Sequence, residues 1–191
     1  MESLGLTIFD TAIGPCGIAW GKRGIVALQL PEANAATTLA RLQRRFPSAR
    51  ESEAPAPVQD VMDRIKALLE GEKADLSIAL LDMENLPPLY RQVYEIALRI
   101  PPGETMTYGA IAREIGDVSL SQAVGQALGK NPYPIIVPCH RVLGANGKTG
   151  GFSGNGGVET KLRILAIEGA RTTSEPDLFG NLPLAMKPRR G

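Results

Sequence analysis

Apolar residues along the first half of the chain occur first in short runs and then every three or four positions. Apolar, β-branched segments lie at residues 4–10, 16–21 and 24–30, and the turn-forming residues Gly14-Pro15 and Lys22-Arg23-Gly24 separate them. This pattern predicts a three-stranded meander. Helical spacing follows over residues 35–46 and 58–69, and residues 76–81 predict a further strand. We therefore expect residues 1–85 to form a small α/β domain.

The second half has the pattern of a mostly helical domain. The paired prolines Pro87 and Pro88 end the strand pattern, and Pro88 can occupy the first turn of a helix. We expect helices over residues 89–100, 105–115, 121–130 and 159–168. The second and third of these, joined by residues 116–120, have the size and connection of a helix-turn-helix. We assign residues 86–171 to this domain and residues 172–191 to a C-terminal tail that packs loosely or is disordered.

Charge is distributed unequally along the chain, although its total is close to zero. The chain has 21 basic and 20 acidic residues. Residues 1–90 carry 9 basic and 12 acidic side chains, whereas residues 91–191 carry 12 and 8. The second half is therefore the half that we expect to meet an anionic partner.

The composition excludes several classes of protein. Hydrophobic residues make up 43% of the chain and charged residues 21%, which is typical of a globular protein and excludes general disorder. The chain begins Met1-Glu2-Ser3 without a basic or apolar leader, and no apolar run approaches the ~18 residues of a membrane span. We expect a soluble, cytoplasmic protein that does not associate with membranes.

The two cysteines differ in their surroundings. With only Cys16, Cys139 and the single histidine His140, the chain has neither a disulfide framework nor the ligands of a structural zinc site. Cys16 lies in a strand pattern, where a small buried apolar residue is the ordinary interpretation. Cys139 directly precedes His140, and an imidazole near a thiol can produce the reactive thiolate. Because neighbouring side chains diverge, we expect a bridging water rather than a direct hydrogen bond.

A glycine-rich segment follows the cysteine. It holds 7 of the 21 glycines between Gly144 and Gly157. Such a segment suits either a loop that lets a ligand approach the backbone or a plain flexible hairpin. On the helix that follows, the residue types of Lys161 and Glu168 favour surface salt bridges for both.

These segments together resemble the O6-alkylguanine-DNA alkyltransferase family, the methylated-DNA–protein-cysteine methyltransferases. The resemblance covers about residues 88–170. It rests on Ile100-Pro101-Pro102-Gly103, Thr107-Tyr108-Gly109, Ala123-Val124-Gly125, Asn131-Pro132, Pro138-Cys139-His140-Arg141-Val142, Gly150-Gly151-Phe152-Ser153-Gly154, and Lys161 through Ile167-Glu168. The resemblance implies a ribonuclease-H-like α/β N-terminal domain and a helical C-terminal domain with a winged-helix-like helix-turn-helix.

The function implied by the resemblance is direct reversal of DNA alkylation. The expected substrate is double-stranded DNA carrying O6-alkylguanine, with O4-alkylthymine as a second candidate lesion. The helix-turn-helix would bind the minor groove, and the damaged base would flip into a pocket. The alkyl group would then move irreversibly to Cys139. The resemblance implies a monomer that turns over once, an enzyme in the stoichiometric sense, with no cofactor and no metal.

The resemblance also assigns roles to single residues. Cys139 would accept the alkyl group, His140 would be the water-mediated base, and Glu168 would orient His140. Asn131 would brace the reactive turn, and Tyr108 would donate toward guanine N3. Since guanine leaves as an anion, such donors lower the barrier to displacement. The remaining implied residues are Ser153, Lys161, Val142 and Gly154 for the substrate, and Gln122, Ala123, Gly125, Thr107 and Lys130 for DNA.

Within the substrate set, Ser153 and Lys161 would lie at the O6 edge of the base. The backbone carbonyls of Cys139 and Val142 would accept from the guanine amino group.

Two positions depart from the family pattern. The family usually has an arginine before Ala-Val-Gly, which fills the space of the flipped base, and this chain has Gln122 there. Glutamine has no charge and a shorter reach, so we expect weaker capture of the lesion in duplex DNA. Phe152 replaces a frequent tyrosine, and the loop through Val158 is longer than in some relatives, which bears on the tolerance for bulky alkyl groups.

Three other functions stay open at this point. A cysteine hydrolase needs an oxyanion hole and a histidine that reaches the thiol directly, which adjacency of Cys139 and His140 disfavours. A helix-turn-helix regulator leaves the Pro-Cys-His-Arg-Val run unexplained. A binder of alkylated DNA that does not repair it is the third, although relatives of that kind replace the cysteine that is present here.

Overall fold

A four-stranded sheet begins the fold. The structure, a computed structural model, describes residues 4–149 and 157–170. Strands β1 (Gly5–Thr11), β2 (Gly14–Gly21) and β3 (Gly24–Gln29) form the predicted antiparallel meander, and the two-residue β4 (Arg50–Glu51) pairs in parallel with β1. The strand order is β3-β2-β1-β4. The sequence pattern did not predict β4, which is too short to show any periodicity.

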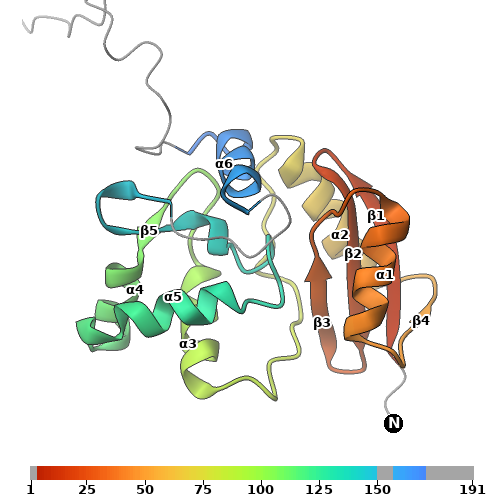
Figure 1. The fold of residues 1–191 in the computed structure, drawn as a ribbon, viewed down its shortest axis with the longest axis horizontal. Helices are drawn as coiled ribbons and strands as arrows, with labels where there is room; N and C mark the ends of the chain where they lie inside the picture. Colours follow the sequence, from red (N-terminus) through yellow and green to blue (C-terminus); the bar gives the residue numbers. More distant parts are fainter. Residues whose placement is uncertain (1–3, 150–156, 171–191) are drawn as a thin grey trace, which may run out of the picture.

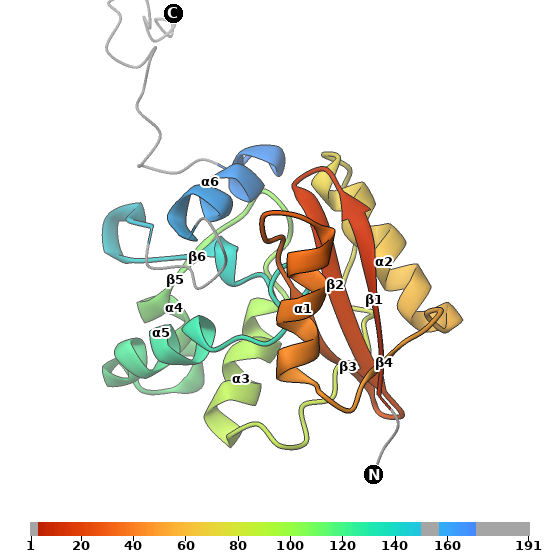
Figure 2. The same cartoon turned by 45° about the vertical axis from the view of Figure 1, so that its right-hand side comes forward.

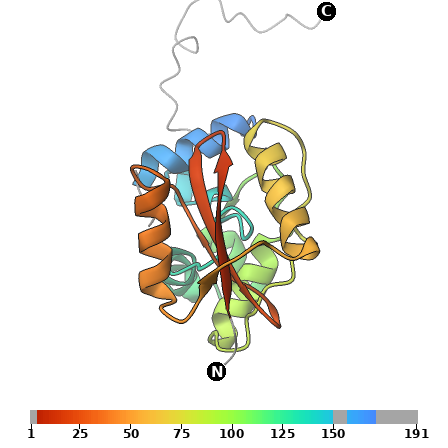
Figure 3. The same cartoon turned by 90° about the vertical axis from the view of Figure 1, so that its right-hand side faces the viewer.

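Two helices cover opposite faces of the sheet (Figure 3). Helix α1 (Ala35–Arg45) packs Leu42 against Leu6, Ala19 and Ala27. Helix α2 (Ala56–Leu69) lies on the other side and joins the larger core. Because alternate side chains of a strand point to opposite faces, the apolar runs of β1 to β3 supply both layers.

The predicted strand over residues 76–81 is wrong. Asp75 accepts a hydrogen bond from the backbone N–H of Ser77 at 2.9 Å, and the N–H of Ala79 bonds to the Leu76 carbonyl at 3.1 Å. These turns bend the segment, because an aspartate side chain can bond the backbone two residues on and so compete with a strand. Only an isolated bridge between Ile25 and Leu81 joins the segment to the sheet.

The second half consists of short helices. Helix α3 (Pro88–Ala97) packs against α5 (Ser121–Gly129), and the hydroxyl of Tyr94 on α3 donates to the Ala127 carbonyl at 2.6 Å. Helix α4 (Tyr108–Ile115) and α5, joined through the 3-10 turn η1 (Val118–Leu120), form the predicted helix-turn-helix. Gly116 ends α4 at a φ of 109°, in the left-handed region that glycine adopts without strain.

A short parallel strand pair links this helix pair to the cysteine segment. Strand β5 (Met106–Thr107) pairs with β6 (Val142–Leu143), which directly follows the 3-10 turn η2 (Cys139–Arg141). The helix expected from residue 105 therefore begins only at Tyr108, where the Thr107 hydroxyl caps it by accepting from the N–H of Ala110 at 3.0 Å. The turn η3 (Ala145–Gly147) and helix α6 (Gly157–Ile167) complete the described chain.

The two halves share one continuous core. Its buried side chains run from Phe9 and Trp20 in the sheet to Val93, Val124 and Ile164 in the helices. The backbone N–H of Leu28 on β3 also donates to the Pro132 carbonyl at 2.9 Å, beside the cysteine segment. Figures 1 and 2 show the sheet lying alongside α3, α5 and α6. The division at residue 85 stays a prediction.

Among the described helices, none has the length and apolarity that crossing a membrane requires. The proposed tail at residues 172–191 lies outside the described residues.

Candidate active site

The segment before the cysteine is a strained turn that Asn131 spans. The Asn131 side chain donates through Nδ2 to the Val137 carbonyl at 2.9 Å and accepts through Oδ1 from the N–H of Tyr133 at 2.9 Å. Inside the turn, Ile135 has a φ of 73°, which is costly for a β-branched residue. The position of Asn131 is thus suited to hold the turn that presents Cys139.

Cys139 lies at the start of η2 and is nearly buried, with 6% of its surface exposed. Burial raises the pKa of its thiol above the ordinary value, and the Asn131 side chain and the Lys161 charge oppose this rise. The resting group is therefore a neutral thiol at neutral pH. Cys16 is fully buried as expected, and burial raises its pKa to about 12.

His140 and Glu168 form the polar interior of the site. His140 Nε2 lies 2.8 Å from Glu168 Oε1, and both side chains are fully buried. Burial alone would raise the pKa of Glu168, but hydrogen bonds from His140 and Arg141 outweigh it and lower the pKa to about 2. Because the carboxylate is ionised, Nε2 carries the proton and donates it. His140 Nδ1 is then the acceptor nitrogen, and it has no hydrogen-bond partner among the described residues.

Arg141 belongs to the same network, which the sequence interpretation missed. Its guanidinium donates to both oxygens of Glu168, from Nε at 2.9 Å and from Nη2 at 2.7 Å, and its Nη1 donates to the Ile100 carbonyl at 2.7 Å. A bidentate arginine fixes the plane of a carboxylate as well as its charge. The available signal was its place directly after His140 within the Pro138-Cys139-His140-Arg141-Val142 run.

Burial favours the neutral form of the His140 ring. Burial lowers its pKa, Glu168 opposes this, and Arg141 and Lys161 add to the lowering. A neutral imidazole beside a neutral thiol can accept a proton when the sulfur reacts, but the pair is not separated into ions beforehand.

The side chains of Lys161 and Glu168 are buried, so the expectation of surface salt bridges for both is wrong. Lys161 is 1% exposed, and its Nζ donates to the Val142 carbonyl at 2.8 Å. Helix α6 packs this face against η2, because the residues around both side chains are apolar and helical spacing places Ile164 and Leu165 beside them. The Val142 carbonyl, expected to accept from guanine, accepts from Lys161 in this structure.

Tyr108 lies where the helix-turn-helix meets the cysteine. It is the first residue of α4, and its ring lies against Gly125, whose added Cβ would be 3.9 Å from two ring carbons. Burial raises the pKa of its hydroxyl, and the neighbouring Cys139 adds to this. The hydroxyl is therefore protonated at neutral pH and can donate.

The remaining predicted residues separate into three groups. Gln122 is exposed on α5, Ala123 and Gly125 are half-buried on the same helix, and Thr107 caps α4. Lys130 follows α5 and lines a cavity beside the cysteine. Ser153 and Gly154 lie outside the described residues, as does Phe152.

Within the described ranges, histidine, cysteine and carboxylate side chains do not gather in threes as a metal site would require.

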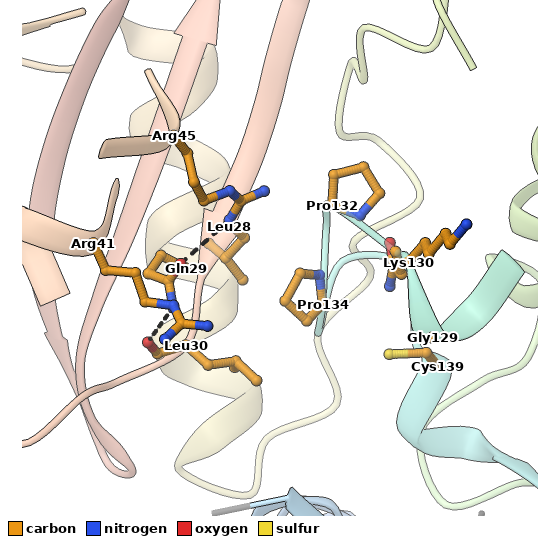
Figure 4. Close-up of a pocket in the computed structure, with 11 residues that line it drawn as sticks. Leu28, Gln29, Leu30, Arg41, Arg45, Gly129, Lys130, Pro132, Pro134 and Cys139 are labelled. Carbon is orange, nitrogen blue, oxygen red and sulfur yellow. Dashed lines mark hydrogen bonds between the residues drawn. The ribbon is translucent and has the colours of Figure 1, made fainter. Parts of the chain in front are cut away.

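That cavity has a volume of about 250 Å³ and lies between the sheet and the cysteine segment. One wall is formed by the end of β3 and by two arginines of α1, namely Leu28, Gln29, Leu30, Arg41 and Arg45. The other wall is formed by Gly129, Lys130, Asn131, Pro132, Pro134 and Cys139. Figure 4 shows the sulfur of Cys139 pointing toward the first wall.

The chain is similar to known proteins that handle methylated DNA or flip DNA bases. Residues 88–170 match the family described as 6-O-methylguanine DNA methyltransferase, DNA binding domain. A methylated-DNA–protein-cysteine methyltransferase of Mycobacterium tuberculosis (strain H37Rv) is 34% identical over 172 residues, which are 89% of this chain and 95% of that protein. The DNA base-flipping protein of Thermus thermophilus is 39% identical over 126 residues, covering 65% of this chain and 82% of that protein.

The mixed α/β fold is similar to the crystal structure of Mycobacterium tuberculosis OGT in complex with DNA. The TM-score is 0.66 at 32% sequence identity, and the match covers 86% of this chain and 92% of that one. With its buried Cys139, His140 and Glu168 on that fold, the chain belongs to the family of methylated-DNA–protein-cysteine methyltransferases.

Proposed function

We propose that the chain repairs duplex DNA by moving the alkyl group of O6-alkylguanine to the sulfur of Cys139. The observation that carries this proposal is the buried series of Cys139, His140 and Glu168, with hydrogen bonds in place from His140 onward. The sulfur attacks the alkyl carbon, an S–C bond forms, and the C–O6 bond breaks with its electron pair passing to guanine. The product is a thioether, so each molecule reacts once.

The proton of the thiol has a defined destination. Because Glu168 accepts from Nε2, His140 Nδ1 is free to take the proton of Cys139 through a water. Glu168 then faces an imidazolium and stabilises it. Burial raises the pKa of the thiol and lowers that of the imidazole, so the proton moves from sulfur to His140 in the course of the reaction and is not already transferred in the resting protein.

The groups around the substrate would stabilise the leaving base. Tyr108, at the junction of α4 and the cysteine, would donate its proton toward guanine N3 as charge develops there. Lys161 and Ser153 would act at the O6 edge, and Val142 and Gly154 would contact the base. Asn131 would hold the turn in the reactive shape. Lys161 would have to share its ammonium group between the Val142 carbonyl and the substrate.

DNA would bind along the helix-turn-helix. The exposed Gln122 on α5 would enter the minor groove, with Ala123, Gly125 and Thr107 close to the backbone and Lys130 at the end of the helix. We further propose a ribonuclease-H-like N-terminal domain, a winged-helix-like helix-turn-helix, and action as a monomer in the cytoplasm without a cofactor. The antiparallel meander with helices on both faces supports the first of these descriptions, and the β5–β6 pair beside α4 supports the second.

The test is a measurement of intact mass. The protein is incubated with an oligonucleotide duplex that carries O6-methylguanine, and the expected result is one added methyl group on Cys139 and none in Cys139→Ser. Cys16→Ser serves as the control and should react as the wild type does. An unchanged mass under conditions where the duplex is bound would contradict the proposal.

An unchanged mass with the duplex bound would favour a second candidate function, that of a protein that binds alkylated DNA and flips the base without repair. The specific observation in its favour is the 39% identity to a protein named for base flipping. The presence of a cysteine with a complete His140–Glu168 pair favours transfer over this alternative.

A further inference from the structure

The cavity beside Cys139 joins the reacting sulfur to two arginines of the N-terminal half. Cys139 lies on one side of the cavity, and Arg41 and Arg45 lie on the other. In Figure 4 both guanidinium groups extend from α1 toward the cysteine segment, whereas the Lys130 amine points away from them. A substituent held next to the sulfur would therefore face the two guanidinium groups of Arg41 and Arg45 across the cavity. We call these two groups the cationic wall.

The charge of this wall is only partly balanced. Arg41 pairs with Glu32 at 3.1 Å, but Arg45 donates to Oε1 of the neutral Gln29 at 3.2 Å. Two cations thus share one carboxylate, and their spacing of four residues along a helix places like charges side by side. Burial lowers the pKa of Arg45, and the charge of Arg41 lowers it further. An additional anion between the two would relieve this repulsion.

The geometry of the reaction directs large substituents toward such a space. In a displacement, the sulfur approaches the alkyl carbon from the side opposite O6, so any chain attached to that carbon must leave the reaction line sideways. A methyl group needs little room. A longer chain needs free volume next to the sulfur, and the cavity that Cys139 borders supplies about 250 Å³. The apolar side chains of Leu28 and Leu30 on one wall and of Pro134 on the other suit a methylene chain.

We propose that this cavity receives O6-alkyl groups that end in a carboxylate, and that Arg41 and Arg45 bind that carboxylate. The proposal rests on the function proposed above and names a substrate class for it, O6-(carboxyalkyl)guanine. The arginines act on substrate specificity and leave the transfer step itself to the residues around Cys139.

The experiment compares charged and neutral lesions of matched shape. Single-turnover transfer rates at limiting protein are measured with duplexes carrying O6-carboxymethylguanine and O6-(3-carboxypropyl)guanine. Each is compared with the corresponding primary amide, and O6-methylguanine is the reference. The variants are the double Arg41→Gln, Arg45→Gln and the control Arg44→Gln, which alters an exposed arginine of the same helix that does not line the cavity.

We expect the wild type to react about fivefold faster with the carboxylate than with the amide at the chain length that reaches the arginines. The double variant should bring this ratio to about 1 and leave methyl transfer unchanged, and Arg44→Gln should change neither. A ratio of 1 or less in the wild type at both lengths would overturn the proposal.

Equal slowing of methyl and carboxyalkyl transfer by the double variant would also overturn it, because the arginines would then contact the DNA backbone. Failure of the wild type to accept even the methyl group would instead refute the proposed function. The two failures are therefore distinguishable.

Discussion

Arg141 donates to both carboxylate oxygens of Glu168, at 2.9 and 2.7 Å, from a position next in sequence to the histidine that the same carboxylate contacts. The carboxylate is fully buried and Arg141 nearly so. The two hydrogen bonds from Arg141 hold the Glu168 carboxylate ionised and in one plane. The ion pair therefore both stabilises the fold and fixes the tautomer of His140, which donates to the same carboxylate.

We expect Arg141→Lys to slow alkyl transfer at least about tenfold while DNA affinity changes little. Lysine keeps the charge but cannot contact both oxygens, so Glu168 would lose its fixed orientation. The transfer rate constant and the Kd for a lesion duplex are measured separately. The control is Arg99→Lys, which alters an arginine of the exposed ion pair with Glu114. An unchanged rate would show that Arg141 has no role in positioning.

The stability of the protein should fall in acid through Glu168. Its pKa of about 2 in the folded state lies below the unfolded value of about 4.3, so its contribution is complete above about pH 5 and disappears as the pH falls toward 2. The shift corresponds to about 3 kcal/mol. The lowered pKa of His140 also reduces stability in acid. Below about pH 6.5 the histidine binds a proton in the unfolded chain more readily than in the folded protein, which favours unfolding.

The measurement is the urea midpoint between pH 7 and pH 3, for the wild type and for Glu168→Gln. We expect the variant to start less stable and to lose less of its stability over this range, because glutamine does not titrate. Parallel curves for the two proteins would refute the assigned source of the acid sensitivity.

Gln122→Arg should strengthen the capture of DNA. Gln122 is exposed on α5, so an arginine there can extend into the duplex without disturbing the core. A higher affinity, a steeper salt dependence and a faster second-order methyl transfer are expected. Gln126→Arg, one turn further on the same exposed face, is the control for the charge alone. If neither affinity nor rate rises for Gln122→Arg, position 122 does not limit capture.

Cys139 should react slowly with ordinary thiol reagents in the absence of DNA. Burial raises its pKa and leaves only 6% of the residue exposed, so we expect alkylation by iodoacetamide at pH 7.5 at least about tenfold slower than that of free cysteine. Cys16, which is fully buried, should react more slowly still. Peptide mapping distinguishes the two sites, and rapid labelling of Cys139 would show that a thiolate exists before the lesion binds.

The sequence pattern predicted the meander and the helices well, because their apolar periodicity is local. It failed at residues 76–81, which have the apolar composition of a strand. There the Asp75 side chain accepts from the Ser77 N–H and stabilises a turn instead. It also placed the start of α4 too early, because the pairing of Met106 with Val142 depends on residues far apart in the chain.

At the site, the adjacency of Cys139 and His140 was visible in the sequence, but the burial of Lys161 and Glu168 was not. Charged residues near the ends of a helix are usually exposed, whereas packing of α6 against η2 removes these two side chains from solvent. The cationic wall of Arg41 and Arg45 was also hidden, since both look like ordinary residues on the outer face of an amphipathic helix.

The pairing of β5 with β6 has a consequence for how the protein and the DNA can move. Thr107 stands opposite Leu143, so the helix that begins at Tyr108 and the turn that carries Cys139 are joined by adjoining strand residues. This pairing holds the helices proposed to bind DNA at a set distance from the sulfur of Cys139. If those helices bind the duplex as proposed, the damaged nucleotide has to travel that distance to react.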